Sequence, residues 1–232
     1  NIITAGVAIT AAIFDGLNIS EMRTSKGALR EGVIYDLLGR ASHEDVRERS
    51  INAMVNRYNA DETNATLVSD RVTYLASQVQ SAWQLTDSEI DALAWAGRCH
   101  EIGVAISQKH YNHHSAYLLA HSDLPGFSQG EQETLASLVR GHRGKLSDDL
   151  FLNIPDRQRP QVSRMIALLR LAVIFKHVEV LETLPEFSVV AKGNTLTLGF
   201  PKAWRKSHPL TTWEINASKS VLGKLGITLR LA

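Results

Sequence analysis

A histidine and a glutamate stand side by side in the segment His100-Glu101-Ile102-Gly103. Three more histidines follow within fourteen positions, and two of them, His110 and His114, are four residues apart, so they would share one face of a helix. Neutral imidazoles and carboxylates can hold a divalent ion with open positions, and such an ion activates water for attack on phosphorus. His100, Glu101, His110 and His114 are therefore weak candidates for metal ligands.

The segment Ala94–Gly103 resembles the His-Asp helix of metal-dependent HD phosphohydrolases, with Glu101 in place of the aspartate. In that family, a His on an earlier helix and an Asp on a later helix complete the site. Alignment puts Val68 at the first of these positions and Val173 or Lys176 at the second. Aliphatic and cationic side chains deprive a metal of much of its shell. We therefore predict no metal site, and histidines that pack and hydrogen-bond within a helical domain; the alternative is an atypical metal shell.

Helices are predicted from Ser42 to about Val180. Apolar residues recur there at helical spacing, as in Val68, Val72, Leu75 and Val79. Three expected helix starts pair a capping hydroxyl with an acid three residues later, which satisfies the free N–H groups of a first turn. These pairs are Ser42 with Asp45, Thr86 with Glu89, and Ser128 with Glu131.

After Leu181 the pattern changes to short alternating segments that are typical of strands. The expected elements are strands at Phe187–Val190, Thr195–Phe200 and Ile227–Leu231, a hairpin turn at Lys192–Asn194 and a helix near Ala217–Leu225. The predicted fold class is therefore mainly α with a small α+β unit. Trp83 and Trp95 are predicted core residues, whereas Trp204 and Trp213 could be buried or exposed at an interface.

The stretch Ile2–Ile19 is strongly apolar, but it contains Asp15 and no Lys or Arg precedes it. It predicts a buried helix and neither a membrane span nor a secretion signal. Because the sequence opens at Asn1, within this apolar element, we expect the chain to be a fragment of a longer protein. The single cysteine, Cys99, excludes an internal disulfide and fits a reducing compartment, so we expect a cytoplasmic location.

The net charge of +1 conceals an uneven distribution of charged residues. Residues 1–139 carry 10 basic and 17 acidic side chains, whereas residues 140–177 carry 8 and 3, and residues 191–232 carry 7 and 1. Clustered Lys and Arg attract a polyanion or an acidic partner surface. The alternative is that these are ordinary solvated faces. Nucleic acid is not an expected partner, because the sequence contains no recognisable nucleic-acid-binding motif.

Five segments of the chain follow one another in a characteristic order and spacing. They are Gly27–Arg40, His100–Gly103, His114–Leu119, Asp123–Phe127 and Leu168–Ala172. Together they resemble the C-terminal half of bacterial exopolyphosphatases and guanosine pentaphosphate phosphohydrolases, and the resemblance covers essentially the whole chain. It implies three parts. They are the last element of an actin-like (ribonuclease H-like) domain at 1–40, an HD-like all-helical domain at 41–180 and a small α+β domain at 181–232.

In this family, the catalytic glutamate, the phosphate-binding loops and a divalent cation, expected to be Mg²⁺, belong to N-terminal actin-like domains. No position of this chain matches them. The resemblance therefore implies a parent protein that is a phosphoric-anhydride hydrolase, and a chain that is inactive alone and holds no catalytic residue or cofactor. It also implies roles in homodimerisation and in binding inorganic polyphosphate or guanosine pentaphosphate, between which the sequence does not decide.

A protein that binds polyphosphate should line a groove with cations, because the ligand is a linear polyanion. The candidates are Arg140, His142, Arg143, Lys145 and Lys176. Arg30 is a further candidate, because the glycines around it let the backbone approach a ligand; the alternative is a salt bridge with Glu31 at a domain junction.

Two other functions remain open at the level of sequence. The chain could be an independent HD-type metal phosphohydrolase that acts on nucleotides, in which case it would hold a stoichiometric metal. It could instead be a non-enzymatic module that binds an acidic partner, in which case polyphosphate would compete with that partner.

Overall fold

The computed structural model describes residues 2–21, 46–179 and 184–232. Contacts divide the chain into two units, residues 1–42 and 43–232. The predictions for Arg30, for the cap at Ser42 and for the segment Gly27–Arg40 lie outside the described residues. Among the described helices, none has both the length and the apolar character needed to cross a membrane.

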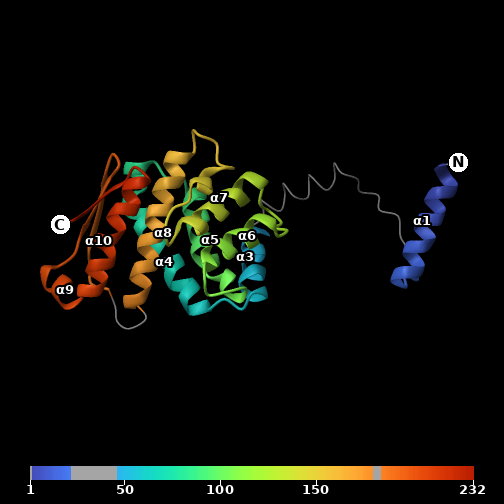
Figure 1. Ribbon diagram of the computed structural model, residues 1–232, viewed down its shortest axis with the longest axis horizontal. Coiled ribbons are helices and arrows are strands. Elements are labelled where there is room, and N and C mark those ends of the chain that lie inside the picture. Colours follow the sequence, from blue (N-terminus) through green and yellow to red (C-terminus); the bar gives the residue numbers. More distant parts are fainter. Residues whose placement is uncertain (1, 22–45, 180–183) are drawn as a thin grey trace. The chain divides into compact units, whose positions relative to one another are not determined.

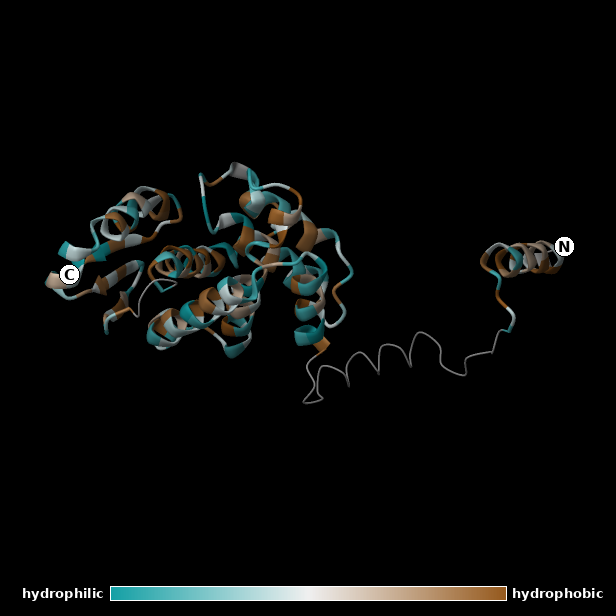
Figure 2. Ribbon diagram, turned by 90° about the horizontal axis from the view of Figure 1, so that it is seen from below, coloured by the Kyte–Doolittle hydropathy of each residue, from teal (hydrophilic) through white to brown (hydrophobic). Residues whose placement is uncertain are grey.

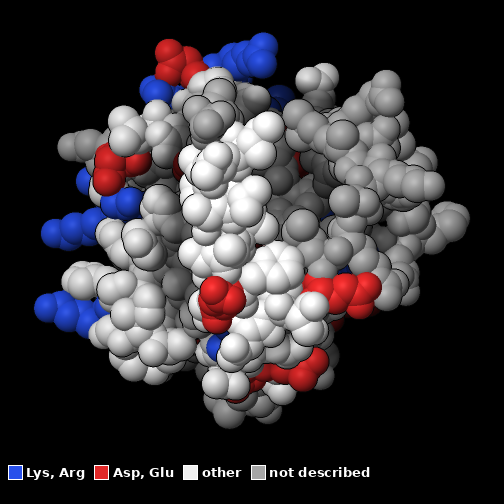
Figure 3. Space-filling model, turned by 90° about the vertical axis from the view of Figure 1, so that its right-hand side faces the viewer, with Lys and Arg blue, Asp and Glu red and all other residues white. Residues whose placement is uncertain are grey.

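The described part of the first unit contains helix α1, Ile2–Leu17. Its residues are mostly hydrophobic or neutral in Figure 2, and Figure 3 shows its surface as almost uninterrupted by charge. The apolar side chains are exposed, with Ile3 82% and Leu17 71% accessible. The predicted helix is confirmed, but its predicted burial is wrong. Residues 2–21 contain no second element against which these side chains could pack.

A helical bundle makes up the larger part of the second unit (Figure 1). Helix α4 packs along both α5 and α8, and α6 packs against α7. The elements are α3 (Val46–Arg57), α4 (Glu62–Trp83), α5 (Asp87–Cys99), η1 (Ile102–Ala105), α6 (Tyr111–His121), α7 (Gln129–Gly141), η2 (Asp148–Phe151) and α8 (Arg159–Glu179), where η denotes a 3₁₀ turn.

Helices α5 and α7 are built to the same plan. Each is 13 residues long and begins with a capping box. Thr86 and Glu89 form the first box, and Ser128 and Glu131 form the second, which confirms both sequence predictions. Each helix is also followed by a histidine at its C-cap position, His100 after α5 and His142 after α7.

A three-stranded sheet and two helices complete the second unit at the C-terminus. Antiparallel strands β1 (Ser188–Lys192) and β2 (Thr195–Gly199) form the predicted hairpin, and β3 (Thr228–Leu231) pairs parallel to β2 with Leu229 opposite Leu196. Helices α9 (Lys202–Ser207) and α10 (Pro209–Lys224) lie between β2 and β3 in the chain. Helix α10 begins earlier than predicted, because Pro209 occupies its first turn, where the fixed φ of proline favours a helix.

One hydrophobic core runs through both parts of the second unit. The Phe175 ring of α8 packs against Phe187 and Phe200, with ring centroids 5.4 Å and 5.6 Å apart. The Trp83 indole N–H donates to the Gly193 carbonyl over 2.8 Å, which ties the hairpin to α4. Trp83 and Trp95 are buried, as predicted. The mainly helical fold with a small α+β unit is confirmed, and the three-domain division stays a prediction.

Candidate functional site

The His100 side chain is completely buried at the C-terminal end of α5. Its Nδ1 lies 2.6 Å from the Gly97 carbonyl oxygen, so Nδ1–H donates this bond and Nε2 is left as an acceptor. Burial lowers the pKa of His100 to about 4, although the neighbouring Glu101 carboxylate opposes this shift. At neutral pH this imidazole is therefore uncharged.

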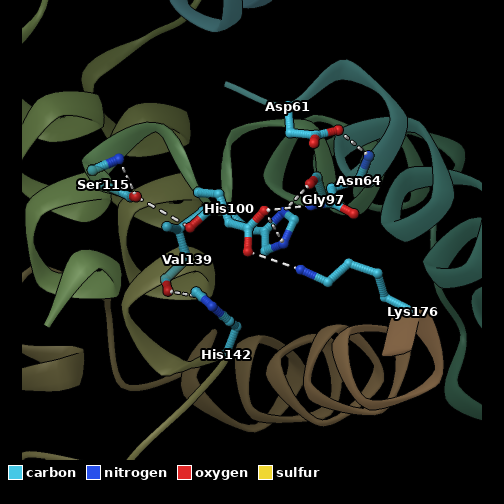
Figure 4. Close-up of polar contacts among 10 residues, drawn as sticks. Asp61, Asn64, Gly97, His100, Ser115, Val139, His142 and Lys176 are labelled. Atoms are coloured by element: carbon cyan, nitrogen blue, oxygen red, sulfur yellow. Dashed lines mark hydrogen bonds and ion pairs between the residues drawn. The ribbon is translucent and has the colours of Figure 1, made fainter. Parts of the chain in front are cut away.

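Glu101 faces a lysine from a distant helix. In Figure 4 the Lys176 side chain reaches toward the residues around His100. The Lys176 ammonium reaches from α8 and donates to Glu101 Oε1 over 2.8 Å, while Asn64 donates to Oε2 over 3.4 Å. Lys176 is only 5% exposed. Burial raises the pKa of Glu101, but His100, the Lys176 hydrogen bond and its charge outweigh burial and leave the pKa below its usual value. Because His100 is uncharged at neutral pH, Lys176 is the cation that stabilises this carboxylate there.

His142 repeats the geometry of His100 at the end of α7. Its Nδ1–H donates to the Val139 carbonyl over 2.5 Å, and its ring lies edge-on to the His100 ring with centroids 5.4 Å apart. Burial, followed by the proximity of His100, lowers the pKa of His142 well below its usual value. The described residues provide no hydrogen-bond partner for Nε2 of either ring. Two neutral imidazoles therefore meet in the core, each with an unused acceptor.

The residues around His100 do not fit a divalent metal ion. Val68 and Val173, at the aligned ligand positions, are buried hydrophobic side chains. The Lys176 ammonium already pairs with Glu101, and its charge would repel a metal ion in the same place. Within the described part of the chain, no group of three or more His, Cys, Asp or Glu side chains is arranged to hold a metal.

The other two candidate ligands lie at the start of α6. His110 is the residue before the helix and has a left-handed backbone with φ of +58°, and its ring pairs with His113 at a centroid distance of 5.7 Å. His114 follows within the first turns of the same helix and is partly buried. The structure brings His100 and Glu101 together with His142 and Lys176, but no metal-holding group in the described residues includes His110 or His114.

Cys99 lies beside this cluster and provides a probe of its integrity. The thiol is completely buried, and burial raises its pKa to about 12. Because the thiolate is the reactive form, we expect a disulfide reagent at pH 8 to modify Cys99 at least about a hundredfold more slowly in the native chain than in guanidinium. Equal rates in both conditions, measured by absorbance of the released thiolate, would show that this core is open in solution.

The predicted phosphate-binding residues divide into exposed and buried groups. Arg143 and Lys145 are exposed after α7, and the Arg143 guanidinium lies 4.4 Å above the Tyr111 ring. Arg140 is partly buried, and its Nη2 donates to both carboxylate oxygens of Asp149, at 2.9 and 2.8 Å. His142 and Lys176 are buried in the cluster described above.

Arg170 of α8 was not predicted from the sequence, yet it holds the segment that carries Arg143. Its side chain is 8% exposed and donates to the carbonyls of Gly141 and Gly144, at 2.6 and 3.0 Å. A charged residue in the otherwise apolar run Ala167–Phe175 is the signal that could have identified it. This arginine connects α8 to the C-terminal end of α7.

Comparisons with protein families match almost all of the chain. The model described as Ppx/GppA phosphatase, domain III, matches residues 46–219. The model described as Ppx/GppA phosphatase family matches residues 1–41.

Curated relatives give the same result. The guanosine-5'-triphosphate,3'-diphosphate pyrophosphatase of Pseudoalteromonas translucida is 34% identical over 226 residues, 97% of this chain and 45% of that protein. The proteins of the same name from Photobacterium profundum and Aeromonas hydrophila are 35% and 34% identical, and the matches cover 91% and 98% of this chain. The matched region spans 42% and 46% of those two relatives, so the chain corresponds to less than half of their length.

Proposed function

Because the chain belongs to the Ppx/GppA phosphatase family, we propose that it is the C-terminal portion of a phosphoric-anhydride hydrolase and binds the phosphate chain of the substrate. Other domains of the whole protein would carry the chemistry and the divalent cation. The names of the relatives favour guanosine 5'-triphosphate 3'-diphosphate over long polyphosphate as the substrate of the whole protein. Homodimerisation belongs to the same proposal.

The observation that carries this proposal is the ion pair between Lys176 and Glu101. A metal phosphohydrolase of the HD type needs that carboxylate free to bind an ion and an activated water. Here the Lys176 ammonium donates a hydrogen bond to the Glu101 carboxylate over 2.8 Å, and the neighbouring imidazoles are buried and neutral. These features favour a helical bundle that serves binding over one that hydrolyses phosphate by itself. They disfavour an independent HD-type phosphohydrolase.

The exposed cations after α7 support phosphate binding. Arg143 and Lys145 are exposed, and Arg170 fixes the backbone between them through the Gly144 carbonyl. A guanidinium presents forked donors that match phosphate oxygens, and an ammonium adds a point charge. A polyanion would bind such a surface in a salt-dependent manner.

This function predicts binding without hydrolysis. We expect the 232-residue chain to bind guanosine pentaphosphate and polyphosphate more weakly as salt rises from about 50 to about 200 mM, in isothermal titration calorimetry. The variant Arg143→Ala/Lys145→Ala should bind about tenfold more weakly, because it loses two phosphate-facing cations. No orthophosphate should be released in the presence of Mg²⁺ or Mn²⁺.

A control variant removes one cation elsewhere on the surface. Arg159 pairs with Asp156 on the surface at the start of α8, so Arg159→Ala should leave phosphate binding unchanged. Rapid release of orthophosphate by the wild-type chain would contradict the proposal that other domains of the whole protein carry the chemistry. Equal binding by Arg143→Ala/Lys145→Ala and wild type would contradict the assigned surface.

A further inference from the structure

A groove lies between α8 and α10. Its first part is a cavity of about 360 Å³, lined by Arg143, Arg170, His177, Trp213 and Glu214 among others. A second cavity of about 510 Å³ shares His177, Trp213 and Glu214 with the first. Because three residues line both cavities, the cavities adjoin each other, and we call the two together the α8–α10 groove. Its size suits a ligand of nucleotide dimensions.

The first part of the groove is cationic. Arg143 is exposed, and its guanidinium lies 4.4 Å above the ring of Tyr111, another residue of this wall. Arg170 keeps both terminal nitrogens on backbone carbonyls, while its Nε has no partner among the described residues. His177 is exposed at the boundary with the second cavity. This arrangement of forked and ring donors favours a phosphate group.

The second part of the groove is apolar and aromatic. Trp213 is 68% exposed and Leu210 is 79% exposed, although such side chains are usually buried. Both residues belong to the first half of α10 and line the same cavity. An exposed indole beside a cavity offers a flat surface on which a planar ring can stack, and stacking of this kind is a common means of binding nucleobases.

An acid stands between the two parts. Glu214 lines both cavities, and its carboxylate can accept two hydrogen bonds but donate none. It would repel a bare phosphate chain. It would instead accept bonds from a ring edge that carries adjacent N–H donors, and guanine carries such an edge whereas adenine presents a single amino group there. The groove therefore combines a phosphate-binding end, a stacking surface and a carboxylate for N–H donors.

We propose that the α8–α10 groove binds a guanine nucleoside phosphate, with the phosphates at Arg143 and the base on Trp213 against Glu214. This rests on the proposed function and deepens it, since it assigns recognition of the base to this part of the chain. An inorganic phosphate chain lacks the ring that Trp213 would hold. A protein helix would cover the apolar part but would leave the cationic part without a partner.

The test compares ligands and variants in the 232-residue chain by isothermal titration calorimetry. We expect GTP to bind at least about tenfold more tightly than inorganic triphosphate, because stacking adds affinity that the inorganic ligand lacks. Trp213→Ala should weaken GTP binding by about tenfold or more, whereas Trp213→Phe should retain most of it. Glu214→Gln should remove the preference for GTP over ATP. The two Trp213 variants should leave the binding of inorganic triphosphate unchanged, whereas Glu214→Gln should strengthen it, because the repelling charge is removed.

Two exposed side chains away from the groove serve as controls, Leu152 and Glu62. Leu152→Ala and Glu62→Gln should bind GTP as the wild type does, and far-ultraviolet circular dichroism checks that every variant is folded. Equal affinities for GTP and inorganic triphosphate, or no effect of Trp213→Ala, would overturn this inference while leaving phosphate binding by Arg143 and Lys145 intact. A different result would separate the two proposals. If GTP bound tightly through Trp213 but polyphosphate did not bind at all, the proposal of polyphosphate binding would be wrong, and nucleotide binding in the α8–α10 groove would be supported.

Discussion

Lys176→Met is expected to lower the free energy of unfolding by about 3 to 5 kcal/mol, because it leaves the Glu101 carboxylate without a cation in a site that is largely closed to water. Wild-type Lys176 is 5% exposed and donates to Glu101 over 2.8 Å. The other polar contacts of this carboxylate, Asn64 at 3.4 Å and a neutral His100, are weaker substitutes. Urea unfolding followed by circular dichroism measures the change.

The double variant Lys176→Met/Glu101→Gln is the control for this result. Removing both charges should recover most of the loss, because no buried ion remains unpaired. The full cycle of single and double variants isolates the coupling between the two side chains. If Lys176→Met were as stable as the wild type, the ion pair would have no structural role and the description of the site would be wrong.

The same pair predicts how stability depends on pH. In the wild type the pKa of Glu101 is lowered by folding, so its contribution is present above the unfolded value and is lost as pH falls through the folded value. In Lys176→Met the carboxylate loses its cation while burial still disfavours its charge, so its folded pKa should rise. The destabilisation of this variant relative to wild type should therefore shrink as pH falls below about 5.

Gly103→Ala is expected to destabilise the chain by about 3 kcal/mol through a clash with the backbone of α6. A Cβ at Gly103 would overlap the backbone nitrogen of Ser115 and the carbonyl oxygen of Tyr111. The Gly103 N–H also donates to Ser115 Oγ over 2.7 Å, and that hydroxyl donates to the His100 carbonyl over 3.1 Å. In thermal unfolding the midpoint should fall by about 6 to 12 °C for a chain of this size.

Gly130 provides a matched control on α7. A Cβ at Gly130 would meet nothing within 4 Å, so Gly130→Ala should leave stability unchanged or raise it by up to about 1 kcal/mol through helix propensity. The rate of Cys99 modification gives a second reading, because Cys99 is buried near the same turn. Equal midpoints for Gly103→Ala and the wild type would show that η1 can move away from α6 without cost.

Local chemistry explains which parts of the fold were predictable. The capping boxes at Thr86 and Ser128 each involve residues only three apart, so their sequence contains the whole interaction. The hairpin around Gly193 is equally local, and the resemblance to the C-terminal half of the family is confirmed. The burial of α1, in contrast, is not determined by residues close to it in the sequence. Apolar composition predicted its helix, but what lies against a helix depends on other elements.

The site itself was only partly predictable, for the same reason. The sequence identified His100, Glu101 and Lys176, and it placed Lys176 near an aligned ligand position. Their contact joins residues 75 positions apart, so it depends on the packing of α5 against α8. Arg170 was missed because its partners are carbonyl groups, which leave no trace in side-chain patterns. Exposure of Trp213 was left open, since an aromatic residue in a small unit can be buried or exposed.

The cation beside Glu101 is a side chain, and this has a consequence for the life of the protein in a cell. A bound ion must be acquired after synthesis, can be withdrawn by a chelator and varies with nutrient supply. The Lys176 ammonium is part of the polypeptide, so every synthesised chain carries one such cation for its Glu101 carboxylate. The bundle can therefore reach its final charge balance at this position as soon as it folds, in metal-starved and metal-rich conditions alike.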